Sequence, residues 1–436
     1  MPLVGSLTSA TMDALELEQR FSRTSRGAPH LDCRFETGNL ALQQTDPLGQ
    51  FIYGQRVDRH ADLVTLGLFD LVIEHGAPLG EGWKKQHYRL RLAEQPRFRQ
   101  HLPMIIPHAM QAIAIARPGG PEALQLLDQP VPQCQSGDVL IRVRAAGVNG
   151  PDLAQRRGYY DPPSGASPLP GLEVSGEIAA ISAEVNDWRI GDPVMALVNG
   201  GGYAHYVAVP SGQVLPLPPS WSMPEAAALP ETWFTVTQTL VMRAGLEPGM
   251  TVLVHGAAGG IGGAAIQIAT ILGARAIGVV SSPAKADYAR RLGAFATIDY
   301  TSEQVGPRAL ALTDDQGVDR VVDLIGGAMT AQNIIASARG GHIVQISTLD
   351  GGDTQVPLRT LMSKQLTISG STLRPQTAQI KKAIAGRIRT DLLPALSAPG
   401  FTKPMVTAFP LADAAQAHRL MESRTHMGKI VLVMPQ

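Results

Sequence analysis

The residues best suited to chemistry are the glycines of one short stretch, HGAAGGIGG at residues 255–263. Ala257, Gly259 and Gly262 have the spacing of a G-x-G-x-x-G motif with alanine in the first place. In such a motif the second glycine lets the main chain approach a pyrophosphate, and the third lets a helix pack closely on a strand. The free N–H groups at the start of that helix attract anionic phosphates. The spacing therefore predicts a dinucleotide-binding loop.

The elements that would position this loop are visible on both sides of it. An apolar strand pattern (251–256) leads into it, an alanine-rich helical segment follows and ends at Gly273, and a second strand pattern covers residues 274–280. Together they form the βαβ unit that the motif requires. A glycine-rich turn needed only for packing is the alternative, and the complete unit argues against it.

The residues about twenty positions after the loop bear on the choice of dinucleotide. An NAD site has a carboxylate there, which hydrogen-bonds to the ribose 2'-hydroxyl. This chain has Val280, Ser281 and Ser282, followed by Lys285. No carboxylate is present to repel a 2'-phosphate, and two hydroxyls and an ammonium can bind one by charge-assisted hydrogen bonds. The pattern favours NADPH as the cofactor, with a solvated surface lysine as the alternative for Lys285.

Composition limits the classes of partner. With 436 residues, 44% of them hydrophobic, the chain should form two or three domains, since single cores stop growing near roughly 250 to 300 residues. Lys+Arg and Asp+Glu are equal at 37 each, so no basic surplus indicates nucleic acid or an anionic membrane. The two cysteines, Cys33 and Cys134, fit a reducing compartment. Without a signal-peptide pattern or a membrane-spanning apolar run, we expect a cytoplasmic protein with a small-molecule substrate.

Sequence patterns change along the chain. Residues 1–107 have no long hydrophobic period, and we expect an extension of unknown role, either disordered or an accessory segment, in which 61–76 has the pattern of a buried helix. Short β-type runs with Gly and Pro turns follow, up to the proline-rich stretch at 214–224. Strands then alternate with helical segments, which indicates a parallel sheet with helices on both faces and an α/β fold class.

Several longer motifs resemble those of a known family: MQAIAIARPGGPEAL (110–124), AAGVNGPDLAQRRGYYDPP (145–163), LPGLEVSGEI (169–178) and GKIVLVMPQ (428–436). They are similar to motifs of the medium-chain dehydrogenase/reductase family, and within it to the zeta-crystallin-like quinone oxidoreductases. The resemblance covers about three quarters of the chain. It implies a GroES-like catalytic domain over 108–232 and 375–436, an inserted Rossmann domain over 233–374, and a homodimer or homotetramer.

Two departures from the zinc-dependent alcohol dehydrogenases of that family bear on the reaction. By the resemblance, a catalytic zinc would need a cysteine where Asn149 stands and a histidine where Leu172 stands. A four-cysteine structural zinc site is excluded because the chain has only two cysteines. Without a Lewis acid, alcohol oxidation is not expected, and no metal site is predicted.

The resemblance also implies roles for individual residues. Asn149 and Tyr160 would line the substrate cleft as catalytic residues. Ser282 and Lys285 would meet the 2'-phosphate. The other residues expected to bind the cofactor are Thr235, Ala258, Gly259, Gly260, Ile261, Gly262, Tyr300 and Arg424. Ordinary packing is the alternative for Thr235 and Tyr300, a bond to its own backbone for Asn149, and an amphipathic wall for Tyr160. Asp152, Glu173 and Asp192 are interpreted as structural.

These observations favour an NADPH-dependent quinone oxidoreductase in which hydride passes to a quinone without zinc. One alternative is an enoyl-thioester or enone reductase of the same fold, with Tyr160 donating the proton. The other is an NADPH-binding protein with little catalysis.

Overall fold

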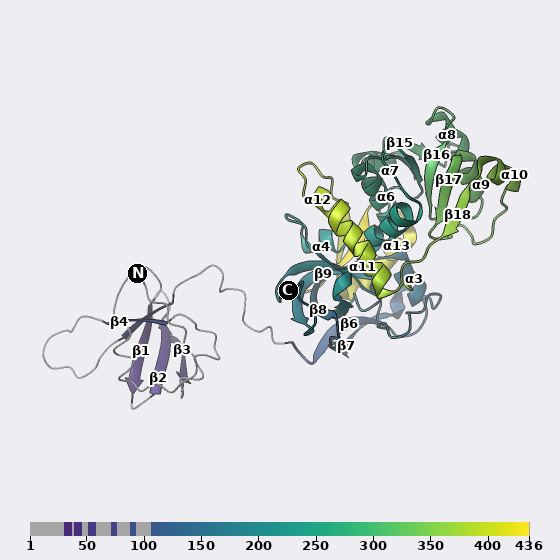
Figure 1. Ribbon diagram of the computed structural model, residues 1–436. Helices are drawn as coiled ribbons and strands as arrows, with labels where there is room; N and C mark the ends of the chain where they lie inside the picture. Colours follow the sequence, from purple (N-terminus) through teal and green to yellow (C-terminus); the bar gives the residue numbers. More distant parts are fainter. Residues whose placement is uncertain are drawn as a thin grey trace. The chain divides into compact units, whose positions relative to one another are not determined.

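The computed structural model describes residues 30–36, 39–45, 51–57, 71–75, 88–92 and 106–435. They belong to two compact units, Met1–Met104 and Ile105–Gln436. The strands of the first unit are β1 (His30–Glu36), β2 (Asn39–Thr45), β3 (Phe51–Val57), β4 (Leu71–His75) and β5 (Tyr88–Leu92). They pair antiparallel in the order β3-β2-β1-β5-β4 (Figure 1).

The helix expected at 61–76 is wrong over Leu71–His75, which forms strand β4 and pairs with β5. A short apolar run that contains the β-branched pair Val72 and Ile73 has no periodicity that separates a buried strand from a buried helix. Pairing with β5 gives partners to the backbone groups on one side of this edge strand. The rest of the expected helix lies outside the described residues.

The second unit contains a mixed sheet with strands from two distant parts of the chain. They are β8 (Asp138–Val148), β9 (Glu173–Ile181), β10 (Pro193–Leu197), β11 (Tyr206–Pro210), β12 (Val214–Pro216), β19 (Val406–Pro410) and β20 (Lys429–Val433). The order is β12-β10-β9-β8-β20-β19, with β11 paired to β8. The final strand thus returns to the first part of this unit, and a hairpin of β6 (Ala109–Ile115) and β7 (Leu124–Pro130) stands beside the sheet.

A six-stranded parallel sheet forms the other half of the second unit. Its strands are β13 (Thr251–Val254), β14 (Arg275–Val280), β15 (Ala296–Asp299), β16 (Val318–Asp323), β17 (Ser337–Gln345) and β18 (Thr367–Gly370). The order is β15-β14-β13-β16-β17-β18, and every pair is parallel. This is the Rossmann order, whose ligand crevice lies at the carboxyl ends of the strands where the order reverses, between β13 and β16.

Helices cover both faces of the parallel sheet. They are α6 (Gly260–Ile271), α7 (Pro283–Arg291), α8 (Val305–Ala311), α9 (Met329–Ala336) and α10 (Leu358–Lys364). Val252 and Val254 pack in one core cluster with α6 and α7, whereas Leu253 packs in another with α8 and α9. Successive side chains of a strand point to opposite faces, so the apolar runs read in the sequence are buried on both sides.

The remaining helices surround the two sheets. They are α3 (Gly150–Arg156), α4 (Met223–Ala226), α5 (Pro230–Val236), α11 (Ala378–Arg387), α12 (Leu393–Leu396) and α13 (Ala414–Ser423), with short 3-10 turns at Pro121–Ala123, Ser211–Gln213 and Leu411–Asp413. Two π-helical turns, η4 (Thr237–Arg243) and η5 (Ile388–Leu392), follow α5 and α11. The domain limits expected at residues 232 and 374 stay a prediction. Within the described residues, no helix is both long and apolar enough for a membrane crossing.

Candidate functional site

The glycine-rich loop lies between β13 and α6, at the carboxyl end of the parallel sheet. Gly259 precedes the twelve-residue helix α6 as its N-cap. A Cβ at Gly262 would lie 2.2 Å from the carbonyl oxygen of Gly256, so only glycine permits this approach of helix to strand. The N–H of Gly428 donates to the carbonyl of Ala258 at 2.8 Å, which links the loop to the start of β20. The loop thus has the form that a pyrophosphate requires.

A polar group follows β14, next to this loop. The ammonium of Lys285 donates to Oγ of Ser281 at 3.2 Å and to the carbonyl of Arg424 at 3.1 Å. Ser282 is the N-cap of α7, and its Oγ accepts the N–H of Lys285. The N–H of Tyr300 donates to Val280 at the end of β14, and the Tyr300 side chain is 51% exposed. The structure therefore brings together Ser282, Lys285, Tyr300 and Arg424.

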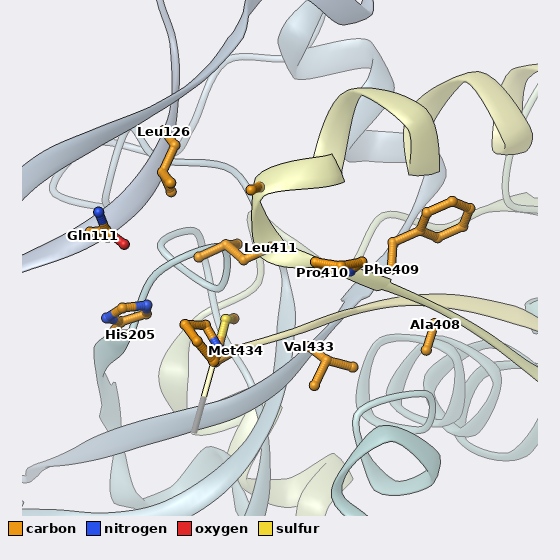
Figure 2. A pocket seen from close by; sticks show the side chains of 11 residues that line it. Gln111, Leu126, His205, Ala408, Phe409, Pro410, Leu411, Val433 and Met434 are labelled. Atoms are coloured by element: carbon orange, nitrogen blue, oxygen red, sulfur yellow. The ribbon is translucent and has the colours of Figure 1, made fainter.

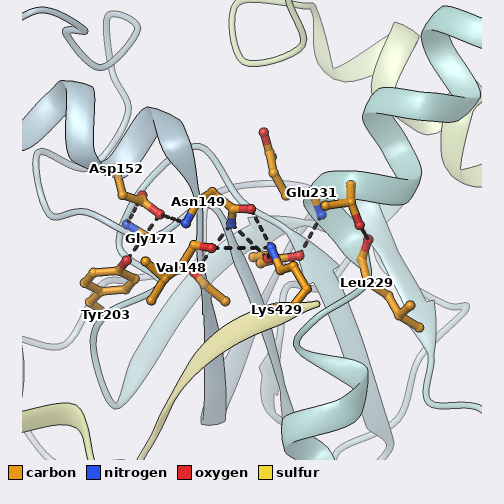
Figure 3. Close-up of polar contacts among 11 residues, drawn as sticks. Val148, Asn149, Asp152, Gly171, Tyr203, Leu229, Glu231 and Lys429 are labelled. Atoms are coloured by element: carbon orange, nitrogen blue, oxygen red, sulfur yellow. Dashed lines mark hydrogen bonds and ion pairs between the residues drawn. The ribbon is translucent and has the colours of Figure 1, made fainter. Parts of the chain in front are cut away.

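Asn149 lies in a buried network rather than bonding to its own backbone alone. Its Nδ2 donates to Oε1 of Glu173 at 2.8 Å, and its Oδ1 accepts from the ammonium of Lys429 at 2.5 Å. The same ammonium lies 2.5 Å from Oε1 of Glu173. Figure 3 shows the side chains of Asn149 and Lys429 directed toward each other, and Glu173 bonds to both of them.

Asp152 holds the backbone on both sides of this network. One carboxylate oxygen accepts the N–H of Asn149 at 2.8 Å, and the other accepts the N–H of Gly171 at 3.0 Å. The hydroxyl of Tyr203 donates to Asp152 at 3.2 Å (Figure 3). Burial raises the pKa of Asp152 to about 6, although these hydrogen bonds oppose the rise. Two of these contacts fix the backbone at Asn149 and Gly171, and the structural role expected for Asp152 stays a prediction.

Glu231 connects the Asn149 network to the second predicted catalytic residue. Its N–H donates to Oε2 of Glu173 at 2.8 Å. Its side chain points away from Lys429 (Figure 3). When ionised, its charge acts to raise the pKa of Tyr160 and of Arg374. Burial, and then the charges of Glu173 and Asp152, raise the pKa of Glu231 to about 8. The carboxyl group is therefore mostly protonated at neutral pH.

Tyr160 lies beside Arg374, with the guanidinium carbon 5.4 Å from the ring centroid. Burial, and then the charge of Glu231, raise the pKa of the Tyr160 hydroxyl above its ordinary value. Thr235 is buried in α5, four residues after Glu231, and therefore on the same face of that helix. Glu231 thus connects the three predicted residues. Its N–H bonds to Glu173, the partner of Asn149, its charge acts on Tyr160, and it shares a helix face with Thr235. The sequence analysis did not select Glu231.

Three functional candidates were missed by the sequence analysis: Glu231, Arg374 and Lys429. Each is a single charged residue next to apolar or turn residues, in the segments LPETWF, TLRPQ and MGKIVL. A lone charge in such a setting is a usable signal, because charged residues are rarely buried without a partner. Their partners are far away in the sequence, and the choice among such charges needs the fold.

A surface pocket of 590 Å³ lies away from these residues. Its lining is mainly apolar and comes from the β6–β7 hairpin, β19, β20 and the residues after them (Figure 2). Leu126, Phe409 and Met434 are among the lining side chains. None of the predicted site residues lines this pocket.

The donors around Asn149 do not match a zinc site. Zinc prefers thiolate, imidazole and carboxylate ligands, whereas the Asn149 side chain is an amide that bonds to the Glu173 carboxylate and to the buried ammonium of Lys429, and the Asp152 carboxylate is already bonded to backbone N–H groups. Leu172, at the place of the second expected ligand, is buried and apolar. A divalent cation here would be repelled by the ammonium and would have one anionic ligand.

Two family models match the chain: "Alcohol dehydrogenase GroES-like domain" over residues 135–219 and "Zinc-binding dehydrogenase" over residues 260–386. A quinone oxidoreductase of Pseudomonas aeruginosa is 34% identical over 324 residues, which cover 74% of this chain and 98% of that protein. A quinone oxidoreductase of Rattus norvegicus is 30% identical over 329 residues, with 74% and 98% coverage.

Among solved structures, Escherichia coli quinone oxidoreductase complexed with NADPH has a TM-score of 0.65 and 28% identity, covering 74% of this chain and 99% of that chain. Both family models match residues of the second unit. The chain therefore belongs to the medium-chain dehydrogenase/reductase family, as a relative of its quinone oxidoreductases.

Proposed function

We propose that this chain is an NADPH-dependent quinone oxidoreductase that transfers hydride without zinc. The observation that carries the proposal is the position of Lys429. Its ammonium bonds to Asn149 and Glu173, while the preceding residue, Gly428, bonds to the phosphate loop. A fixed protein cation thus stands where zinc-dependent relatives would need metal ligands, directly beside the dinucleotide loop.

The residues present fit NADPH. Gly259 to Gly262 would hold the pyrophosphate at the start of α6, and Ser282 and Lys285 would donate hydrogen bonds to the 2'-phosphate. The carbonyl of Arg424 accepts from Lys285, and the N–H of Tyr300 donates to Val280 at the end of β14. The related E. coli enzyme is complexed with NADPH. When bound, NADPH supplies the hydride.

A quinone suits a site that offers hydrogen bonds and no Lewis acid. A quinone is already electrophilic, because its reduction makes the ring aromatic. The oxyanion formed needs only a hydrogen bond and a proton. The chain's own residues would orient the ring and exclude water. Tyr160 offers an apolar ring with a protonated hydroxyl for this purpose. The names of the P. aeruginosa and rat relatives support this substrate class.

The direct test has two steps. Competition binding should give a tighter Kd for NADPH than for NADH, because only NADPH has a 2'-phosphate. The purified chain should then oxidise NADPH with at least some of a panel of ortho- and para-quinones. Binding of NADPH without turnover of any quinone would remove the proposal and leave the alternative of an NADPH-binding protein with little catalysis.

One observation favours a second candidate, an enoyl-thioester or enone reductase. The hydroxyl of Tyr160 is half-buried, and burial raises its pKa further above its ordinary value, so it carries a proton at neutral pH, as a proton donor to the α-carbon would need to. Tyr160→Phe should then abolish turnover of an α,β-unsaturated substrate. Quinone reduction should change little in the same variant, since solvent can protonate the oxyanion. The cytoplasmic location, the homodimer or homotetramer and the absence of a nucleic-acid partner stay predictions.

A further inference from the structure

Arg374 is a buried arginine whose guanidinium is only partly hydrogen-bonded. It follows β18 and is 5% exposed. Its Nε and Nη2 donate to the carbonyl oxygen of Asn199 at 3.0 and 2.8 Å, which fixes the guanidinium plane. Its Nη1 is buried and has no partner within the described part of the chain. A buried charged donor without an acceptor is costly, so this nitrogen indicates an acceptor that comes from outside the chain.

Other buried polar atoms without partners lie in the segment of Arg374 and in a segment that contacts it. Eight such side-chain atoms occur in the described residues, and four of them belong to Thr237, Gln238, Ser371 and Arg374. The Nε2 of Gln238 donates to the carbonyl of Thr372 at 3.4 Å, so the two segments that carry these atoms are in contact. Two hydroxyls, an amide oxygen and a guanidinium without partners suit a polar ligand better than a packed core.

The neighbours of Arg374 indicate the charge of that ligand. Tyr160 lies against the guanidinium, and the ammonium of Lys381 donates to the carbonyl of Arg374 at 2.8 Å. Two acidic groups face these cations. Glu231 faces both Arg374 and Lys381, and Asp152 faces Arg374. Since Glu231 keeps its proton below about pH 8, the two cations outweigh the negative charge around them at neutral pH. Such a group favours an oxygen on which negative charge develops.

We propose that Nη1 of Arg374 hydrogen-bonds to the acceptor oxygen of the substrate and stabilises it as an oxyanion during hydride transfer. This inference rests on the proposed function. In the reaction the quinone gains a hydride, with its two electrons, and the carbonyl π pair moves to oxygen as the ring becomes aromatic. A proton from water completes the hydroquinone, and the dinucleotide is left oxidised. Arg374 gives up no proton.

The kinetic test compares two arginine variants. Arg320 is the matched control, because its Nη1 and Nη2 also donate to backbone carbonyls and its Nε also lacks a partner. Arg374→Ala should lower kcat by about 100-fold, the usual cost of removing one oxyanion donor, with the Kd of NADPH unchanged. Added methylguanidinium should restore part of the lost kcat. Arg320→Ala should keep the wild-type kcat.

Three outcomes would overturn the inference. One is a kcat for Arg374→Ala equal to that of Arg320→Ala. Another is a loss of NADPH affinity as large as the loss of activity, which would mean that Arg374 binds the dinucleotide. The third is a loss of activity accompanied by an equal loss of thermal stability and no rescue by methylguanidinium, which would mean a structural role.

A binding measurement separates this inference from the proposed function. Para-nitrophenolate resembles the hydroquinone anion and changes its absorption spectrum when a cation binds its oxygen. With oxidised dinucleotide present, we expect wild type and Arg320→Ala to shift the spectrum and Arg374→Ala not to. This result supports the oxyanion site even if no quinone is turned over. Equal shifts in all three proteins would overturn it even if quinones are reduced.

Discussion

The ammonium of Lys429 and Oε1 of Glu173 lie 2.5 Å apart, and both side chains are buried. This ion pair joins β20 to β9, two strands that are not neighbours in the mixed sheet. It also fixes Asn149, which bonds to both partners. The contact of Lys429, near the C-terminus, with Glu173, in the first part of the unit, therefore fixes Asn149 in the predicted substrate cleft.

Lys429→Met should strongly destabilise the fold. The substitution leaves the Glu173 carboxylate buried without its cation, and breaking a buried pair in this way costs about 3–5 kcal/mol. The double variant Glu173→Gln with Lys429→Met should recover part of this loss, because no charge is then left unpaired. Denaturant unfolding of wild type, Lys429→Met, Glu173→Gln and the double variant measures both effects. Equal stability of the single and double variants would contradict this account of the pair.

Lys285→Ala should weaken NADPH binding and leave NADH binding unchanged. A hydrogen bond to a charged group contributes about 1.5–3 kcal/mol, so the Kd of NADPH should rise by roughly 10- to 100-fold. Lys382 on α11 is exposed and serves as the control lysine. Fluorescence titration with both dinucleotides checks the result. An equal loss for NADPH and NADH would show that Lys285 does not meet the 2'-phosphate.

Gly262→Ala should impair folding and dinucleotide binding together. The added Cβ would lie 2.2 Å from the carbonyl oxygen of Gly256, so α6 must move away from the loop. Gly386→Ala is the matched control, because nothing lies within 4 Å of a Cβ at this position in α11. That change should be neutral or stabilise the helix by about 0.5–1 kcal/mol. The two melting temperatures and the NADPH affinity are the measurements, and a normal Gly262→Ala protein would disprove the close approach.

The contribution of Glu231 to the stability of the protein should fall as pH rises from mildly acidic values to about 8. Burial raises the pKa of Glu231 from 4.5 to about 8, so between these values the folded chain keeps a proton that the unfolded chain has released. The stabilising contribution is therefore complete below the unfolded pKa and is lost as pH approaches the folded pKa, by at most about 1.4 kcal/mol per pH unit.

Glu231→Gln isolates this effect, since glutamine has a similar shape and does not titrate. The difference in unfolding free energy between wild type and Glu231→Gln should change with pH in the sense that wild type loses more as pH rises. Denaturant unfolding at several pH values gives the two curves. Parallel curves would mean that Glu231 has an ordinary pKa.

Local patterns in the sequence predicted the parts of the site that depend on local geometry. The Gly259 and Gly262 spacing and the Ser282 to Lys285 segment each act within one turn of chain, and the structure has a loop, an N-cap and a helix there. The β4 strand was misassigned because its short apolar run, Leu71 to Ile73, has no distinguishing period.

The polar network was not predictable from local patterns. Lys429 meets Glu173 across 256 positions, Arg374 meets Asn199 across 175, and the N–H of Glu231 meets Glu173 across 58. No spacing rule connects residues at such separations. Their pairing follows from the return of β20 to the mixed sheet and from the packing of the two sheets of the second unit.

The central claim is hydride transfer from NADPH to a quinone without a metal. It is tested most directly by the rate of NADPH oxidation by a quinone before and after treatment with a strong zinc chelator. We expect the chelator to leave the rate unchanged, and NADH to be a poorer donor than NADPH. Loss of activity on chelation with recovery on adding zinc, or the absence of turnover from a protein that binds NADPH, would contradict the claim.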